Sequence, residues 1–133
     1  MCSILCVDKK IENHDEINHY LKYRGPDETN IIENDGFTYI HNLLSITGDY
    51  TPQPFEKDNI IFLFNGEIYN YKDFGDYKSD GLCLIDLYKE YGTEFVKKLD
   101  GEFAILLMDF NKDLILMATD IFKTKPLFYS TDD

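Results

Sequence analysis

The sequence has little positive charge. Its 133 residues include 25 aspartates and glutamates but only 13 lysines and arginines, and the net charge is −12. Nucleic-acid-binding domains need a basic surface, so this balance argues against a nucleic-acid partner and against docking on an anionic membrane. We interpret the excess of acidic residues as a solvated surface. Only one arginine is present, Arg24.

Cysteines and long apolar runs are also scarce. The three cysteines are odd in number and lack Cys-x-x-Cys spacing, which is typical of a reduced protein rather than of a disulfide scaffold or a zinc site. No apolar run approaches the roughly 20 residues that a membrane-spanning helix needs. The N-terminus lacks the charged leader and long apolar stretch of a signal peptide. We therefore expect a cytoplasmic protein without a membrane partner.

The length allows one domain, residues 1–133, with room for a hydrophobic core. Runs of apolar, β-branched and aromatic residues predict strands, and apolar residues at helical spacing predict helices. Predicted strands cover residues 2–7, 37–41, 43–46, 59–64, 103–109, 114–119 and 127–129, and predicted helices cover residues 14–23, 82–91 and 93–99. The strand 59–64 would place Asn65 and Gly66 at its end, and His41 would be a hydrogen-bonded core residue. Mostly antiparallel strands with separate helices indicate an α+β chain.

One cysteine has an unusual position, directly after the initiator methionine. If Met1 is removed, Cys2 becomes the first residue and carries a thiol and a free α-amine together. A thiol is a good nucleophile only as the thiolate, and an α-amine, with an unperturbed pKa of about 7.7–8, can act as its base. One residue could then supply both groups. On its own the position says little, because an early cysteine is by default a small buried apolar residue.

Five further short motifs follow in order along the chain. Any one alone is a poor signal, since strings such as Asn-Gly are ordinary turn sequences. The motifs are Arg24-Gly25-Pro26-Asp27, Asn65-Gly66-Glu67-Ile68-Tyr69-Asn70, Ser79-Asp80, Asp100-Gly101-Glu102-Phe103-Ala104, and Asp120 followed by Lys125-Pro126-Leu127-Phe128-Tyr129. Together with Met1-Cys2 they resemble the class II glutamine amidotransferase domain, in particular the glutaminase half of asparagine synthetases. The resemblance implies the four-layer αββα sandwich of N-terminal-nucleophile hydrolases, with mostly antiparallel sheets.

The resemblance also implies roles for individual residues. Cys2 would be the nucleophile of glutamine hydrolysis through a γ-glutamyl thioester, and the Asn65 side-chain amide and the Gly66 N–H would form the oxyanion hole. A glycine suits that place, because a backbone N–H must approach the developing charge closely. Arg24 matches a family position near the nucleophile, and Leu44 and Ile46 match positions that line the glutamine pocket. Glu67 and Asp80 match positions that contact the α-amino group of glutamine.

One departure from the family pattern bears on substrate binding. The family usually has Arg-Leu-Ser-Ile where this chain has Leu43-Leu44-Ser45-Ile46, and that arginine clamps the α-carboxylate of glutamine. Leucine cannot make such a charge-assisted contact. Three interpretations stay open: a glutaminase that supplies ammonia to an asparagine-synthetase-like enzyme, a weakened or inactive family member that serves as a binding or scaffold domain, and a hydrolase of another amide that lacks the carboxylate.

The resemblance implies that this domain acts together with a synthetase domain. In the family the domain continues past the Lys125–Tyr129 motif with further strands, followed by a synthetase domain, so we expect this chain to be the N-terminal portion of the domain, truncated at its C-terminus. The chain itself is expected to need no cofactor and no metal, because ATP and Mg²⁺ belong to the synthetase domain. The expected partners are glutamine and an ATP-dependent synthetase domain or subunit that accepts the ammonia.

Overall fold

Two antiparallel β-sheets form the centre of the protein in the computed structural model, which describes residues 1–131. The strands are β1 (Ser3–Val7), β2 (Glu28–Asn34), β3 (Phe37–Leu43), β4 (Phe55–Lys57), β5 (Ile60–Ile68), β6 (Gly101–Asp109) and β7 (Leu114–Thr119). The α-helices are α1 (His14–Ile17) and α2 (Leu84–Tyr91), and the 3₁₀ helices are η1 (Leu21–Arg24), η2 (Tyr71–Phe74), η3 (Asp80–Cys83) and η4 (Gly92–Lys98).

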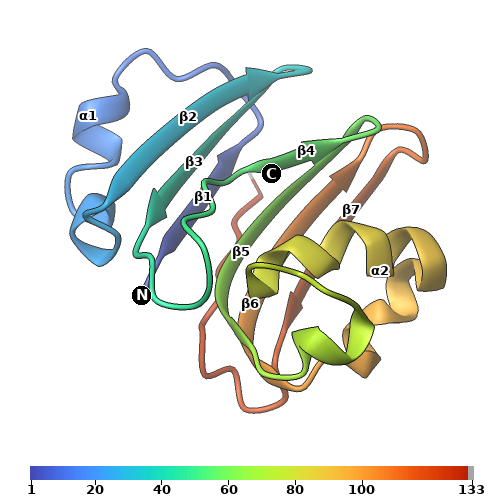
Figure 1. The fold of residues 1–133 in the computed structure, drawn as a ribbon. Coiled ribbons are helices and arrows are strands. Elements are labelled where there is room, and N and C mark those ends of the chain that lie inside the picture. The colour runs from blue at the N-terminus through green and yellow to red at the C-terminus, as the bar shows by residue number, and fades with distance from the viewer. Residues whose placement is uncertain (132–133) are drawn as a thin grey trace.

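The two sheets stack face to face and carry helices on their outer sides (Figure 1). One sheet has the strand order β1-β3-β2 and the other has the order β4-β5-β6-β7. Helix α1 lies outside the first sheet, and α2 lies outside the second. This helix–sheet–sheet–helix order confirms the expected α+β sandwich of the N-terminal-nucleophile hydrolase type. Within residues 1–131, no helix is long and apolar enough to cross a membrane.

The side chains between the sheets follow from strand alternation, because successive residues of a strand point to opposite faces. An apolar cluster fills the middle of this space with Tyr39, Ile61, Leu63, Leu106 and Met108. Asn65 and Glu67 continue the alternation of β5 and so share its inner face. Cys2 precedes the inner residues Ile4 and Cys6 of β1, which pack against the same cluster. The polar candidates therefore lie at one end of an otherwise apolar space.

The outer faces of the two sheets are covered in different ways. Beneath α2 lies an apolar cluster of Ile60, Phe62, Phe64, Ile68, Cys83, Leu84, Ile85, Leu87, Tyr88, Phe95, Phe103, Ile105 and Leu107. The outer face of the other sheet includes a buried polar network. The Asn42 Nδ2 group donates to Asn18 Oδ1 at 2.7 Å and to Ser3 Oγ at 2.8 Å. This network ties the segment around α1 to β1 and β3.

Most predicted elements are present with shifted bounds. The hairpin of residues 103–109 and 114–119 is confirmed as β6 and β7, and the helix 82–91 begins only at Leu84, after a 3₁₀ turn. The segment 93–99 is helical but of the 3₁₀ type. The strand expected to end at Phe64 continues to Ile68, so Asn65 and Gly66 lie within β5 rather than beyond it.

Three predicted elements are wrong in part or in whole. The predicted helix 14–23 is divided into α1, which ends at Ile17, and the 3₁₀ helix η1, which begins at Leu21; Asn18 between them is buried and bonds to Asn42. The stretch 43–46 is not a strand beyond Leu43. Residues 127–129 have no strand partner within the described part of the chain and form no strand, and the side chains at 128 and 129 are largely exposed.

Two strands, β2 and β4, were not predicted at all. Each is the mostly polar member of a hairpin closed by a two-residue turn. Asn34 pairs with Phe37 across Asp35-Gly36, and both turn residues have positive φ, 50° and 85°. A two-residue turn with positive φ at both positions is the favoured hairpin connection, and Asp-Gly is a strong signal for it. That signal was available in the sequence.

Candidate active site

A pocket lies at the end of the inter-sheet space where β1 begins and β3 ends. Both sheets and the loops that follow them contribute to its wall. The residues that line it are Met1, Cys2, Leu43, Leu44, Ser45, Ile46, Thr47, Asp49, Thr51, Gln53, Phe55, Phe64, Asn65, Gly66, Glu67, Ser79, Asp80, Gly81, Glu102 and Lys125. Every candidate residue from the sequence is among them except Arg24. Residues far apart in the chain thus meet in one place.

The thiol of Cys2 is held by the main chain just beyond β3. Its Sγ atom accepts a hydrogen bond from the Leu44 N–H at 3.3 Å and lies 3.6 Å from the Leu44 carbonyl oxygen, to which it can donate. Burial raises the pKa of the Cys2 thiol, and the Leu44 N–H opposes that shift. The surroundings of the thiol therefore do not favour the thiolate. The thiol needs a base to become a nucleophile.

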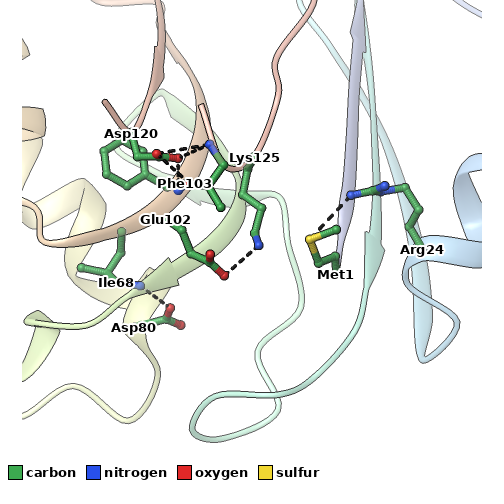
Figure 2. Close-up of polar contacts among 9 residues, drawn as sticks. Met1, Arg24, Ile68, Asp80, Glu102, Phe103, Asp120 and Lys125 are labelled. Carbon is green, nitrogen blue, oxygen red and sulfur yellow. Dashed lines mark hydrogen bonds and ion pairs between the residues drawn. The ribbon is translucent and has the colours of Figure 1, made fainter. Parts of the chain in front are cut away.

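Arg24 lies beside the N-terminus rather than on the pocket wall. Its Nε atom donates to the Cys2 carbonyl oxygen at 3.3 Å. Its Nη2 atom lies 3.9 Å from the Met1 sulfur, the contact drawn in Figure 2. These contacts suit a residue that fixes the main chain at Cys2. In this arrangement the guanidinium supports the nucleophile's position and does not face the space that a substrate would fill.

The motif that contains Arg24 also shapes the opposite wall. The Asp27 Oδ2 atom accepts from the Ser45 N–H at 2.8 Å, and the Asp27 N–H donates to the Leu43 carbonyl at 3.0 Å. The chain at Gly25 passes so close to β3 that an added Cβ would overlap the Asn42 carbonyl. These contacts replace the strand partners that β3 lacks beyond Leu43, and they hold Leu44 against Cys2.

The second half of β5 has an open edge that faces the pocket. Strand β4 pairs with β5 only up to Phe62. Beyond that point two side chains take over, since Gln53 Oε1 accepts from the Phe64 N–H at 2.7 Å and Asp80 Oδ2 accepts from the Ile68 N–H at 2.9 Å. Alternate N–H groups of a strand point to the same edge, so the Gly66 N–H lies between these two. Within residues 1–131 it has no hydrogen-bond acceptor.

Gly66 occupies a place that no other residue fits. Its φ is 152°, and an added Cβ would overlap the Glu102 carbonyl oxygen and lie 2.7 Å from the Phe103 Cα atom. Its neighbour Asn65 is buried, and the Asn65 Oδ1 atom has no hydrogen-bond partner within the described residues. A backbone N–H without an acceptor and a side-chain amide whose oxygen has no partner are thus adjacent on the pocket wall.

Carboxylates dominate the charge of the pocket. Asp80 is 5% exposed, and burial raises its pKa although the N–H groups of Ile68 and Gly81 oppose the shift. Glu67, Asp49 and Glu102 line the same pocket. A site with this charge favours a ligand that carries an ammonium group.

Sequence reasoning gave no role to several residues of the wall. Glu102 and Lys125 stand within the quoted motifs, but nothing in the sequence indicates that the two side chains meet, with Lys125 Nζ 2.7 Å from Glu102 Oε1. Gln53 lies in a loop, and only its contact with Phe64 reveals its part in the open edge. No group of three or more potential metal ligands is clustered within residues 1–131.

A family profile described as a glutamine amidotransferase domain matches residues 1–133. The chain belongs to the glutamine amidotransferase domain family. Its curated relatives include asparagine synthetase 2 (glutamine-hydrolyzing) of Bacillus subtilis, which is 34% identical over 83% of this chain and 16% of its own length. Asparagine synthetase B (glutamine-hydrolyzing) of Escherichia coli is 33% identical over 89% of this chain and 24% of its own length. This chain therefore spans about a quarter or less of these two relatives.

Proposed function

We propose that the chain is a glutaminase domain that hydrolyses the side-chain amide of glutamine through a thioester on Cys2. One observation carries the proposal: the Cys2 thiol, the Gly66 N–H on the open edge of β5 and the Asn65 side-chain amide share one pocket. Amide hydrolysis needs a nucleophile and preorganised donors for the developing oxyanion. The family membership supports the same reaction.

In the proposed reaction the α-amine of Cys2, freed by removal of Met1, takes the thiol proton while Sγ attacks the amide carbon of glutamine. The Gly66 N–H and the Asn65 side-chain amide donate to the oxyanion. The C–N bond then breaks, the leaving nitrogen takes the proton from the α-amine, and ammonia departs. Water, deprotonated by the same amine, attacks the γ-glutamyl thioester, releases glutamate and restores the thiol. The raised pKa of Cys2 agrees with the need for this base.

The substrate's α-ammonium is proposed to bind between Glu67 and Asp80. Both carboxylates line the pocket, and Asp80 is held against the β5 edge by the Ile68 N–H. Leu44 and Ile46 supply the apolar wall for the methylene groups of glutamine. Arg24 is proposed to act on the nucleophile's main chain, at the Cys2 carbonyl oxygen.

The ammonia is proposed to pass to an amide-forming, ATP-dependent synthetase domain or subunit. The names of the relatives describe glutamine-hydrolyzing asparagine synthetases, each far longer than this chain. The glutaminase reaction itself, as written above, uses no cofactor. A cytoplasmic location agrees with three cysteines that are all free thiols.

Glutamate release from glutamine, measured together with the intact mass of the same sample, tests the proposal. We expect the active protein to lack Met1 and the Cys2→Ala variant to lose activity by roughly 10⁴-fold or more. Cys6→Ala is the matched control, because Cys6 lies on the same face of β1 and should leave the reaction unchanged. Hydrolysis that persists in Cys2→Ala would refute the proposal.

A further inference from the structure

The pocket contains a single basic side chain. Within residues 1–131, Lys125 is the one lysine or arginine that lines it. The residue is 6% exposed, and its Nζ atom donates to Glu102 Oε1 at 2.7 Å. Figure 2 shows the side chain reaching from the C-terminal segment toward β6, on the side of the sheet that faces Met1.

The register of the second sheet places this ammonium close to the proposed reaction centre. Glu102 is the cross-strand partner of Glu67 in the β5–β6 ladder. Directly opposed residues of an antiparallel pair lie on the same face with their Cβ atoms about 4.5–5.5 Å apart. Glu67 directly follows Gly66. The Lys125 ammonium therefore contacts the inner face of the second sheet at Glu102, opposite the residue that follows Gly66.

The Lys125 ammonium has capacity for a second partner. An ammonium has three N–H donors, and within the described residues Nζ has one hydrogen bond, to Glu102. Burying a cation is unfavourable unless its donors are used. The neighbouring side chains of the wall, Glu67 and Asp80, are carboxylates. A bound zwitterion would bring a further carboxylate, and Lys125 is the one lysine or arginine among the described wall residues that could pair with it.

A dedicated turn holds Lys125 in this place. The Asp120 carboxylate accepts hydrogen bonds from the Phe103 N–H at 3.2 Å and from the Phe122 N–H at 3.0 Å. It also accepts from the N–H and the hydroxyl of Thr124, both at 3.0 Å. These contacts pin residues 120–124 to the start of β6, so Lys125 emerges directly over Glu102 (Figure 2). Asp120 is thus a positioning residue for Lys125.

We propose that the Lys125 ammonium binds the α-carboxylate of the substrate, the task for which Leu43 supplies no charge. This inference rests on the proposed glutaminase function and names the group that recognises one end of the substrate. The site would then hold the two charged groups of an α-amino acid separately, with the ammonium at Glu67 and Asp80 and the carboxylate at Lys125.

The test compares glutamine with γ-aminobutyramide, the same amide without the α-carboxylate. For Lys125→Met we expect KM for glutamine to rise by about 10- to 100-fold, the effect of one charged hydrogen bond, with a smaller change in kcat. The kcat/KM for γ-aminobutyramide should stay unchanged. Lys125→Arg keeps the charge and should retain most of the affinity for glutamine. Leu43→Arg added to Lys125→Met should lower KM again. Lys123→Met, an exposed lysine in the same turn, is the control.

Binding of the product supplies a readout that needs no catalysis. Glutamate should bind the wild type more tightly than Lys125→Met by a similar factor, whereas γ-aminobutyrate, which lacks the α-carboxylate, should bind both equally. An equal loss for the substrates with and without the carboxylate would overturn the inference, because it would indicate a structural role for Lys125. Unchanged KM for glutamine, or no binding of glutamate by the wild type, would overturn it too. If glutamate binding depends on Lys125 but glutamine is not hydrolysed, the proposed function fails and the inference stands.

Discussion

The middle and the end of the space between the two sheets differ in what their side chains contact. Those in the middle pack against one another, whereas those at the end line a pocket. In the middle, Ile61 and Leu63 of β5 are at most 1% exposed and pack against Tyr39. At the end, Asn65 and Glu67 continue the same face of the same strand, but they line a pocket together with Cys2. One half of β5 builds the core, and the other half presents polar groups to the pocket, among them an Asn65 Oδ1 atom without a hydrogen-bond partner within residues 1–131.

The difference arises where the pairing of β4 with β5 ends. The first half of β5 is paired on both edges, by β4 and by β6, whereas its second half is paired only by β6. Two side chains cap the open edge at Phe64 and Ile68, and the Gly66 N–H between them is left over. Gly66 is only partly buried and lines the pocket, so its N–H is available to a ligand that accepts a hydrogen bond.

The largest expected effect comes from adding a methyl group at Gly66, against the neighbouring strand β6. In Gly66→Ala the new Cβ would overlap the Glu102 carbonyl at a φ of 152°. We expect the free energy of unfolding, measured with urea, to fall by about 3–4 kcal/mol and glutaminase activity to be lost. The control is Gly36→Ala, which meets nothing within 4 Å and should cost about 1 kcal/mol through its backbone alone. Equal losses in the two variants would contradict the close approach at Gly66.

The second prediction separates function from stability at the same end. Asn65→Ala removes an amide whose Oδ1 atom has no partner in the described structure. We expect kcat for glutamine to fall by roughly 100- to 1000-fold, as for the loss of one oxyanion donor. The free energy of unfolding should change by only about 1 kcal/mol. A large loss of stability with little change in kcat would place Asn65 with the core instead.

The third prediction concerns His41, which lies on β3 between Tyr39 of the apolar cluster and Leu43 of the pocket. It is fully buried, and neither ring nitrogen makes a hydrogen bond of good geometry within residues 1–131, although the Phe64 main chain is close enough to oppose the effect of burial on the pKa of His41. Burial lowers the pKa of His41 to about 4 from its usual 6.5.

Because the unfolded chain binds the proton more readily, the stability is complete above pH 6.5 and declines as the pH falls toward 4. Between pH 7.5 and pH 5 we expect a loss of about 2 kcal/mol from this residue. Urea titrations at both pH values check it, with His41→Leu as the variant in which this part of the loss disappears. An unchanged pH dependence in that variant would show that other groups are responsible.

The smallest expected effect is on the free energy of unfolding when Gln53, which caps the open edge of β5 at Phe64, is replaced. Gln53→Leu leaves the buried Phe64 N–H without its acceptor and should lower the free energy of unfolding by about 1–2 kcal/mol. Thr51→Val, whose hydroxyl bonds only within its exposed loop, is the matched control and should change little. If the two variants behave alike, the side-chain cap on β5 is not needed for folding.

The sequence was sufficient for the fold class, and every candidate residue it named except Arg24 lines the pocket, because the resemblance to the family implies both. It was insufficient for the open edge. That edge depends on where β4 stops and on a glutamine in a loop, and neither has a local pattern. β2 was missed although Asp35-Gly36 marks its turn, because polar residues occupy both faces of this half-exposed strand and leave no alternation of apolar and polar residues. Lys125 could not be assigned to the pocket, since its place depends on the turn around Asp120 and on the register of β6.

The most direct test of the account is a crystal structure of the protein after reaction with diazo-oxo-norleucine, an electrophilic analogue of glutamine. The account predicts one adduct, on Cys2 Sγ, with its carbonyl oxygen about 2.7–3.1 Å from the Gly66 nitrogen and within reach of the Asn65 amide. An adduct on Cys6 or Cys83, or a carbonyl oxygen turned away from the open edge of β5, would contradict it.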